Sequence, residues 1–317
     1  MKEILVIIVT VVVGLFIVIE VALRSLFGFG NPLIYIADEQ IGYLLAPNQQ
    51  TRRYGNRIEI NQYSMRAEAI QEFSPPSTLR VLLLGDSIAN GGWWTDQNNT
   101  ISSLLQHSLI SAHLSNFNQI QVLNASANSW GPRNELAYLQ KFGSFNAQVV
   151  VLLINTDDLF ATAPTSLPVG RDRNYPNRKP PLALVEVFER YINKPKPIPE
   201  MQAVQKEAGD RVGLNLEAIS KIQALTRASN SHFLLVMTPL LREVSPLEPR
   251  DYEIKARQRL SEFAKNQQIR YVDFLPIFNS SNNPKTFYHD HIHLNLQGNQ
   301  LVNEVIEQTL RELLELG

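Results

Sequence analysis

The order of apolar and polar residues along the chain predicts an α/β domain. Short apolar runs, rich in Val, Ile and Leu, occupy residues 81–84, 121–123, 149–154, 233–237 and 271–274. Apolar residues recur at helical spacing in residues 101–114, 134–145, 182–192, 214–228, 252–266 and 297–316. Buried strands that alternate with helices form parallel sheets. We therefore expect a five-stranded parallel sheet covered by helices, within a domain of residues 79–317.

The first segment of the chain has a different pattern. Residues 4–19 carry no charge and are apolar on every face, and the stretch continues to residue 23. This gives about 20 residues, or roughly 30 Å of helix, which is the thickness of a bilayer core. A cleaved signal peptide has a shorter apolar region and a small-x-small cleavage pattern, which residues 20–25 lack. We expect residues 1–27 to be a retained transmembrane anchor.

The charged residues on either side of this anchor give only a weak signal for which end of it lies in the cytoplasm. Lys2 precedes the apolar span, and Arg24 is the one basic residue close after it. We expect a single-pass protein whose catalytic domain lies outside the cytoplasm. Residues 28–78 are then a juxtamembrane prelude, and the period-two alternation of residues 57–61 predicts a short strand there.

Residues 160–181 form the longest irregular stretch of the sequence. They contain five prolines together with Arg171, Arg173, Arg178 and Lys179. The segment predicts a long surface loop near the edge of the sheet at which a functional site would lie. Its basic residues fit a solvated loop with an incidental charge excess, or a loop that grips an anionic glycan or lipid headgroup.

The overall composition excludes several classes of function. The chain has 317 residues, of which 44% are hydrophobic and 19% charged, as in ordinary core-forming domains. Lys and Arg total 29 against 30 Asp and Glu, and no long stretch is strongly basic, so nucleic acid is not an expected partner. Cysteine is absent, which excludes disulfides, thiolate nucleophiles and cysteine-containing zinc sites.

The first chemical signal lies where the first core strand ends. The run 81–84 leads directly into Gly85, Asp86 and Ser87, which presents a serine at a strand-to-helix turn. Ligands bind at the carboxyl edge of open parallel sheets, and the backbone N–H of Ser87 is placed to donate to an oxyanion there. The alternative is a serine that only caps the following helix.

The second signal stands before the last predicted helix. Asp290 and His293 are three residues apart, so the imidazole can take a serine proton while the carboxylate orients it. His289, Asp290, His291 and His293 are also nominal zinc ligands, but the rest of the sequence adds no further ligand cluster, and we expect no metal. His289 and His291 are expected to be solvated loop residues, and Asn295 to cap the last helix.

Together the two signals resemble the SGNH or GDSL hydrolase family. Its first block is Gly-Asp-Ser after the first strand, found here at residues 85–87, and its last is Asp-x-x-His before a helix, found here at 290–293. The resemblance covers roughly residues 79–316 and implies a flavodoxin-like three-layer α/β/α fold, hydrolysis or transfer of acyl esters, and no cofactor. Residues 38–66 also resemble the prelude of membrane-tethered bacterial members.

The middle blocks of the family fit less well. Ser129 stands where the family has an oxyanion-hole glycine that contributes a backbone N–H. Thr156 stands at the position of an asparagine donor, and Asn155 precedes it by one residue. Either the Thr156 hydroxyl replaces the amide donor, or Asn155 reaches the site from a shifted loop, or the oxyanion hole has decayed.

These residues predict a serine esterase. We expect Ser87 to be the nucleophile, His293 the general base and acid, and Asp290 the orienting carboxylate, acting on an acylated small molecule or glycan. Trp93, Trp94 and Trp130 follow the first two blocks; Trp93 and Trp130 are candidates for substrate stacking, against the alternative of ordinary packing. Two other functions remain open: an O-acetyltransferase acting on a cell-envelope polysaccharide, and a non-catalytic glycan-binding pseudoenzyme.

Overall fold

The computed structural model, which describes residues 1–112, 114 and 116–315, contains the expected five-stranded sheet. Its strands are all parallel and lie in the order β6-β5-β7-β8-β9, the flavodoxin-like order with one reversal beside the first core strand. Each predicted apolar run overlaps one of them, and only Phe274 of the last run lies beyond its strand, at the start of α9 (Phe274–Asn279). The strands are β5 (Thr78–Gly85), β6 (Gln119–Ser126), β7 (Val149–Asn155), β8 (His232–Thr238) and β9 (Arg270–Asp273).

Both faces of the sheet are covered, because alternate residues of a buried strand point to opposite sides. In β5, Leu82 and Leu84 join one apolar cluster, whereas Val81 and Leu83 join the other. The first cluster lies beneath α4 (Pro132–Phe142), α7 (Arg211–Ala228) and α8 (Asp251–Asn266). The second lies beneath α3 (Ile101–Ser111), α9 (Phe274–Asn279) and α10 (Leu296–Glu315). The three-layer α/β/α prediction is confirmed.

The prelude packs onto this domain as two β-hairpins. β1 (Tyr35–Asp38) pairs with β2 (Gly42–Leu45), and β3 (Gln49–Arg53) pairs with β4 (Asn56–Ile60). Their apolar side chains share the first core cluster with α4 and the sheet. The sequence pattern predicted only β4, because the other three strands are short and lack a clear period of two.

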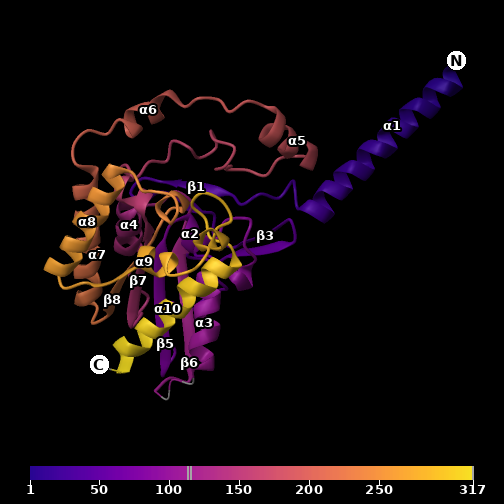
Figure 1. The fold of residues 1–317 in the computed structure, drawn as a ribbon. Coiled ribbons are helices and arrows are strands. Elements are labelled where there is room, and N and C mark those ends of the chain that lie inside the picture. The colour runs from indigo at the N-terminus through magenta and orange to yellow at the C-terminus, as the bar shows by residue number, and fades with distance from the viewer. Residues whose placement is uncertain (113, 115, 316–317) are drawn as a thin grey trace.

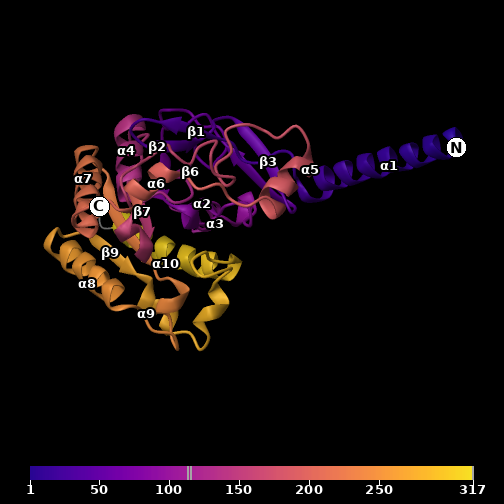
Figure 2. The same ribbon diagram turned by 90° about the horizontal axis from the view of Figure 1, so that it is seen from above.

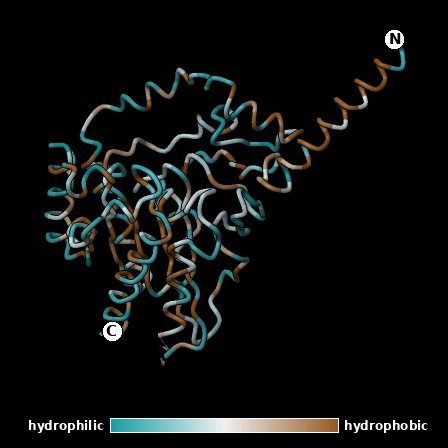
Figure 3. Tube along the Cα trace, turned by 45° about the vertical axis from the view of Figure 1, so that its right-hand side comes forward, coloured by the Kyte–Doolittle hydropathy of each residue, from teal (hydrophilic) through white to brown (hydrophobic). Residues whose placement is uncertain are grey.

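The N-terminal helix projects away from the domain in both views (Figures 1 and 2). α1 (Lys2–Ala22) continues as the π-helical turn η1 (Leu23–Phe27), and most of its residues are hydrophobic (Figure 3). Almost all of its side chains are exposed. This is a helix long and apolar enough to be a membrane span or a signal sequence. At its base, Glu20 accepts hydrogen bonds from the backbone N–H groups of Ala183 and Leu184, so the helix is fixed to the domain there.

A long connection after β7 arches over the end of the domain that carries α2 (Ser87–Asn90) (Figure 1). It begins with η3 (Thr156–Phe160), runs through irregular chain to residue 182, and then forms α5 (Ala183–Val187), η4 (Phe188–Ile192) and α6 (Pro199–Gln205). The loop expected at residues 160–181 is therefore present. The remaining short helices are η2 (Gln97–Asn99), η5 (Leu241–Glu243) and η6 (Pro284–Phe287).

Candidate active site

Side chains from the two ends of the domain sequence meet at the carboxyl edge of the sheet. Ser87 is the first residue of α2, directly after β5, and Asp290 and His293 lie in the loop before α10. The Nε2 atom of His293 lies 2.9 Å from Ser87 Oγ, and its Nδ1 atom lies 2.8 Å from Asp290 Oδ2. A single imidazole thus links the hydroxyl to the carboxylate.

The loop that carries this pair is a small closed turn. Tyr288 and Leu294 form an antiparallel bridge across it, and Asp290 Oδ1 accepts hydrogen bonds from the backbone N–H groups of Ile292 and His293. Burial acts to raise the pKa of Asp290, but the hydrogen bonds from His293 and from these N–H groups outweigh it and lower the pKa. Asp290 therefore stays ionised where it orients the imidazole.

The other two histidines of this loop do not reach Ser87. His291 is exposed, and His289 lies flat against Trp94, with 5.7 Å between ring centroids. Asn295 caps α10 as expected, because its side-chain oxygen accepts from the Gly298 N–H. Among residues 1–112, 114 and 116–315, no three His, Asp or Glu side chains are arranged to hold a metal ion.

Asp86, rather than Ser87, is the N-cap of α2. Its carboxylate accepts from the Ile88 backbone N–H at 2.8 Å and from Asn155 Nδ2 at 2.8 Å. The Ser87 hydroxyl lies 3.4 Å from the same carboxylate, farther than from His293. The cap leaves the Ser87 side chain free to face the imidazole, which removes the alternative of a purely capping serine.

Three buried acidic side chains stand behind the serine. Asp158 accepts from the backbone and side-chain N–H groups of Asn155, and Glu135 on α4 has neither carboxylate oxygen hydrogen-bonded within the described residues. Burial raises the pKa of Asp86, Asp158 and Glu135, and the charge of Asp86 adds to the rise at the other two. Release of a proton is therefore harder from each of these carboxyls than from an exposed one.

Two backbone N–H groups are available for an oxyanion. The N–H of Ser87 heads the first turn of α2 and so has no acceptor within the helix. The N–H of Ser129 donates to no atom of the described residues, and Ser129 lines the same cavity as Ser87. Ser129 has φ +59°, in the left-handed region that glycine adopts freely and other residues rarely adopt.

Tyr175 holds Ser129 in this conformation, a contact that the sequence did not reveal. The Tyr175 hydroxyl donates to Ser129 Oγ at 2.9 Å, and its ring packs 5.0 Å from both Tyr35 and Tyr43. Tyr43 in turn donates to the carbonyl of Asn128 at 2.6 Å. The long loop and the prelude therefore both fix the candidate oxyanion turn.

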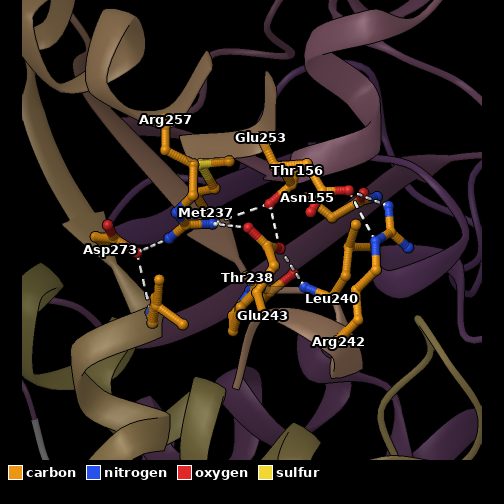
Figure 4. A network of polar contacts seen from close by, with 12 residues as sticks. Asn155, Thr156, Met237, Thr238, Leu240, Arg242, Glu243, Glu253, Arg257 and Asp273 are labelled. Atoms are coloured by element: carbon orange, nitrogen blue, oxygen red, sulfur yellow. Dashed lines mark hydrogen bonds and ion pairs between the residues drawn. The ribbon is translucent and has the colours of Figure 1, made fainter. Parts of the chain in front are cut away.

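The two candidates for a further donor point in different directions. Asn155 Nδ2 donates to Asp86 and Asp158, within the cluster behind Ser87. The expectation for Thr156 needs correction: its hydroxyl donates to Glu243 and accepts from Arg257, in the network that Figure 4 shows. A hydroxyl has a single proton, so Thr156 has no donor left for an oxyanion.

The three tryptophans near the motifs lie in two different places. Trp93 is 42% exposed and lines the cavity beside Ser87, together with Trp94. Trp130 is wrongly expected at the substrate, because its side chain is buried in the core and its Nε1 donates to the Tyr43 carbonyl. An aromatic residue close to a motif in sequence can point to either side of a loop. The Trp130 side chain points into the core, where it buries a large apolar area.

Arg66 in the prelude positions the turn that carries Trp93 and Trp94. Its buried guanidinium donates to the backbone carbonyls of Asn90, Gly92 and Thr95, and burial lowers its pKa to about 9. Sequence reasoning missed this role, although Arg66 ends the stretch in which the prelude resembles membrane-tethered relatives.

One cavity of about 460 Å³ opens onto Ser87 and His293. Its walls come from the prelude, from the turn after α2 that carries Trp93, and from the long connection between β7 and α7, which we call the arch. Arg53, Tyr175 and Tyr191 are among the lining residues. A hydroxyl, an imidazole that an ionised carboxylate holds from behind, and backbone N–H groups thus meet at a cavity of ligand size.

Comparison with known proteins agrees with this chemistry. The model of the GDSL-like lipase/acylhydrolase family matches residues 83–301. The chain belongs to this family. It is therefore a hydrolase that acts on ester bonds, an esterase of the SGNH type. A comparison with curated proteins finds no match to the chain.

Solved structures that resemble this GDSL-family protein are distant in sequence. An α/β hydrolase from the metagenome of Lake Arreo, Spain, is 14% identical, with a TM-score of 0.48 over 74% of this chain and 95% of that one. An acetyl xylan esterase is also 14% identical, with a TM-score of 0.48 over 73% and 99%. A catalytic mutant of an acetylxylan esterase from Geobacillus stearothermophilus is 12% identical, with a TM-score of 0.47 over 75% and 95%. Likeness at this distance does not carry a substrate from one protein to another.

Proposed function

We propose that this GDSL-family esterase uses Ser87 as its nucleophile, His293 as general base and acid, and Asp290 as the orienting carboxylate. The observation that carries the proposal is the 2.9 Å contact between Ser87 Oγ and His293 Nε2, with Asp290 on the opposite ring nitrogen. Nε2 takes the hydroxyl proton as Oγ attacks the ester carbonyl, and Asp290 stabilises the imidazolium that forms. The imidazolium then protonates the leaving alkoxide, and water cleaves the acyl-enzyme by the same steps.

The oxyanion of each tetrahedral intermediate is stabilised by the backbone N–H groups of Ser87 and Ser129. Both residues line the cavity, and the Ser129 N–H has no competing acceptor within the described residues. Preorganised donors of this kind contribute about 3 to 4 kcal/mol each to transition-state stabilisation. Asn155 supports the hole through Asp86 and does not itself donate.

We also propose the arrangement of the whole chain. Residues 1–27 anchor it in a membrane, residues 28–78 are a prelude that walls the cavity, and residues 79–317 form the catalytic domain outside the cytoplasm. Docking of Glu20 against the start of α5 supports a retained helix, because cleavage after the apolar segment would remove the carboxylate that accepts from Ala183 and Leu184.

A fluorophosphonate probe tests the nucleophile. The full-length protein in detergent is expected to be labelled on Ser87 and to hydrolyse 4-nitrophenyl acetate. The Ser87→Ala variant should lose both, with kcat lower by about 10⁴-fold or more. His293→Ala and the double variant should be nearly as inactive as Ser87→Ala, because the members of a triad act as a unit. Full hydrolysis by Ser87→Ala would contradict the assignment.

Carbonate washing tests the anchor. The intact protein should stay in the membrane pellet, and deletion of residues 1–30 should release it. A wild-type chain recovered in the soluble fraction with a new N-terminus near residue 25 would show a cleaved signal instead.

A further inference from the structure

One wall of the cavity is positively charged. Arg53 on β3, Arg173 in the arch and Arg190 on η4 all line the cavity, and its lining within the described residues includes no Asp or Glu. Glu186 contacts both Arg53 and Arg190, and its other oxygen accepts from the Gly30 N–H. Three guanidinium groups are thus offset by one carboxylate, and the wall keeps an excess of positive charge.

Arg53 is held in an unusual environment for a cation. Its side chain is 7% exposed, and its guanidinium lies 4.3 Å from the centroid of the Phe29 ring. Nη2 donates to Glu186, but Nη1 has no acceptor within the described residues. A buried donor without an acceptor costs free energy, and an oxyanion that enters the cavity would supply both the acceptor and the missing negative charge.

A band of aromatic rings connects this wall to the ester site. Ring centroids follow one another at 4.3 Å from His293 to Trp94, 5.7 Å to Trp93, 5.4 Å to Tyr54 and 5.9 Å to Phe29, and all five residues line the cavity. The last ring is the one on which Arg53 stacks. The band therefore runs from the imidazole to the cationic wall.

The polar residues along the same cavity suit a saccharide better than an acyl chain. Asn128 and Asn174 line it, and the buried Oδ1 atom of Asn128 has no donor within the described residues. Aromatic faces pack against the C–H faces of sugar rings, and amide groups pair with hydroxyls, whereas a long acyl chain would leave these amides unpaired.

We propose that Arg53, Arg173 and Arg190 form an anion-binding subsite, and that the substrate is an acylated saccharide carrying a carboxylate or phosphate group. The inference rests on the proposed esterase function, since it extends the cavity that Ser87 and His293 share. The ester lies at Ser87, the sugar rings lie along the aromatic band, and the anionic group lies against the guanidinium groups.

Matched substrates test the subsite in the full-length protein in detergent. We would measure kcat/KM for acetylated di- and trisaccharides of glucose, and for the same saccharides ending in glucuronate or in glucose 6-phosphate. The charged substrates should be preferred by about 10- to 100-fold, the effect of a charge-assisted hydrogen bond. Arg190→Gln and Arg53→Met should each reduce this preference by about tenfold or more, and raising the salt concentration should weaken it.

Arg171→Gln is the matched control, because Arg171 lies in the same loop but pairs with the exposed Glu200 and does not line the cavity. It should keep the full preference. If Arg53→Met does not fold, Arg190→Gln and Arg173→Gln carry the test, since both side chains are more exposed.

Three results would overturn the subsite: equal kcat/KM for charged and neutral saccharides, a preference that the arginine variants leave unchanged, or a charge preference found only between lysophosphatidylglycerol and monoacylglycerol micelles. In each case, fluorophosphonate labelling of Ser87 would show that the esterase assignment still stands. Absence of labelling together with inactivity on every ester would instead contradict the proposed function.

Discussion

Adjacent residues at the end of β7 belong to two polar networks of opposite character. Asn155 joins the acidic cluster behind Ser87, through Asp86 and Asp158. Thr156 joins Glu243 and Arg257, and Arg257 continues to Asp273 at the end of β9 (Figure 4). Both networks lie at the carboxyl edge of the sheet, yet only the first is next to the cavity that contains Ser87.

The two networks differ in how completely their polar atoms are paired. In the Thr156 network, Thr156, Glu243 and Arg257 have no buried side-chain atom without a partner within the described residues. Around Ser87, both carboxylate oxygens of Glu135 and the backbone N–H of Ser129 have no hydrogen-bond partner within the described residues. Ser129 also holds a left-handed backbone conformation. Unpaired groups and strain therefore gather at the proposed active site, and the neighbouring network supplies a rigid edge.

Breaking the satisfied network should give the largest effect on stability. Arg257→Met would leave Glu243 and Asp273 without their cation, and we expect the free energy of unfolding to fall by about 3 to 5 kcal/mol. Urea unfolding measures the loss. Activity per fluorophosphonate-reactive site should remain that of the wild type, because Arg257 does not line the cavity.

Arg259→Met is the matched control, since Arg259 lies on the same helix but pairs with Asp210 at the surface. Its loss should change stability by less than about 1 kcal/mol. Equal destabilisation by the two variants would contradict the contrast between the networks.

The pair Asn155 and Thr156 tests the division directly. Asn155→Ala removes a donor to two buried carboxylates beside Ser87, so kcat should fall by about tenfold with little change in KM. Thr156→Val keeps the shape but takes a partner from Glu243 and Arg257, so stability should fall by about 1 to 3 kcal/mol while kcat per labelled site stays constant. A drop in kcat for Thr156→Val alone would return the donor role to Thr156.

The sequence was sufficient for the sheet and for the group around Ser87, because those features depend on local order. An apolar run followed by Gly-Asp-Ser places Ser87 directly after a parallel strand, at the carboxyl edge of the sheet. Asp-x-x-His places His293 in the loop before the last helix. Asn155 and Thr156 were not separable on the same grounds. Neighbouring residues at a strand end point to opposite sides, so a shift of one position decides between the two networks.

The contacts that sequence reasoning missed all join distant segments. Tyr175, in the irregular chain before α5, donates to Ser129 after β6. Arg53 on β3 donates to Glu186 on α5, and Arg66 in the prelude donates to the Gly92 carbonyl after α2. Trp130 was placed wrongly for the same reason, because its surroundings come from the prelude through Tyr43. Periodicity and motif spacing carry no information on which irregular segments fold against each other.

The acidic cluster gives a pH-dependent prediction. Burial raises the pKa of Glu135 well above the usual value, so above about pH 4.5 the unfolded chain releases a proton that the folded chain keeps. The folded state then binds more protons, and stability falls by up to about 1.4 kcal/mol per pH unit as the pH rises. Glu135→Gln should flatten this slope in urea titrations between about pH 5 and 7. The exposed Glu217→Gln on α7 should leave the slope unchanged.

The smallest expected effect concerns the strained turn, and a double-mutant cycle isolates it. Tyr175→Phe removes the hydrogen bond to Ser129 Oγ, worth about 0.5 to 1.5 kcal/mol, so kcat should fall by about three- to tenfold as the turn leaves the left-handed conformation more often. Ser129→Gly removes the same bond but also the strain, because glycine adopts positive φ without a Cβ clash, and kcat should stay near the wild-type value. In the Ser129→Gly background, Tyr175→Phe should then have no further effect. If the two changes instead multiply, Tyr175 acts on the site by a route other than the Ser129 hydroxyl, and the turn does not need the long loop to present its N–H.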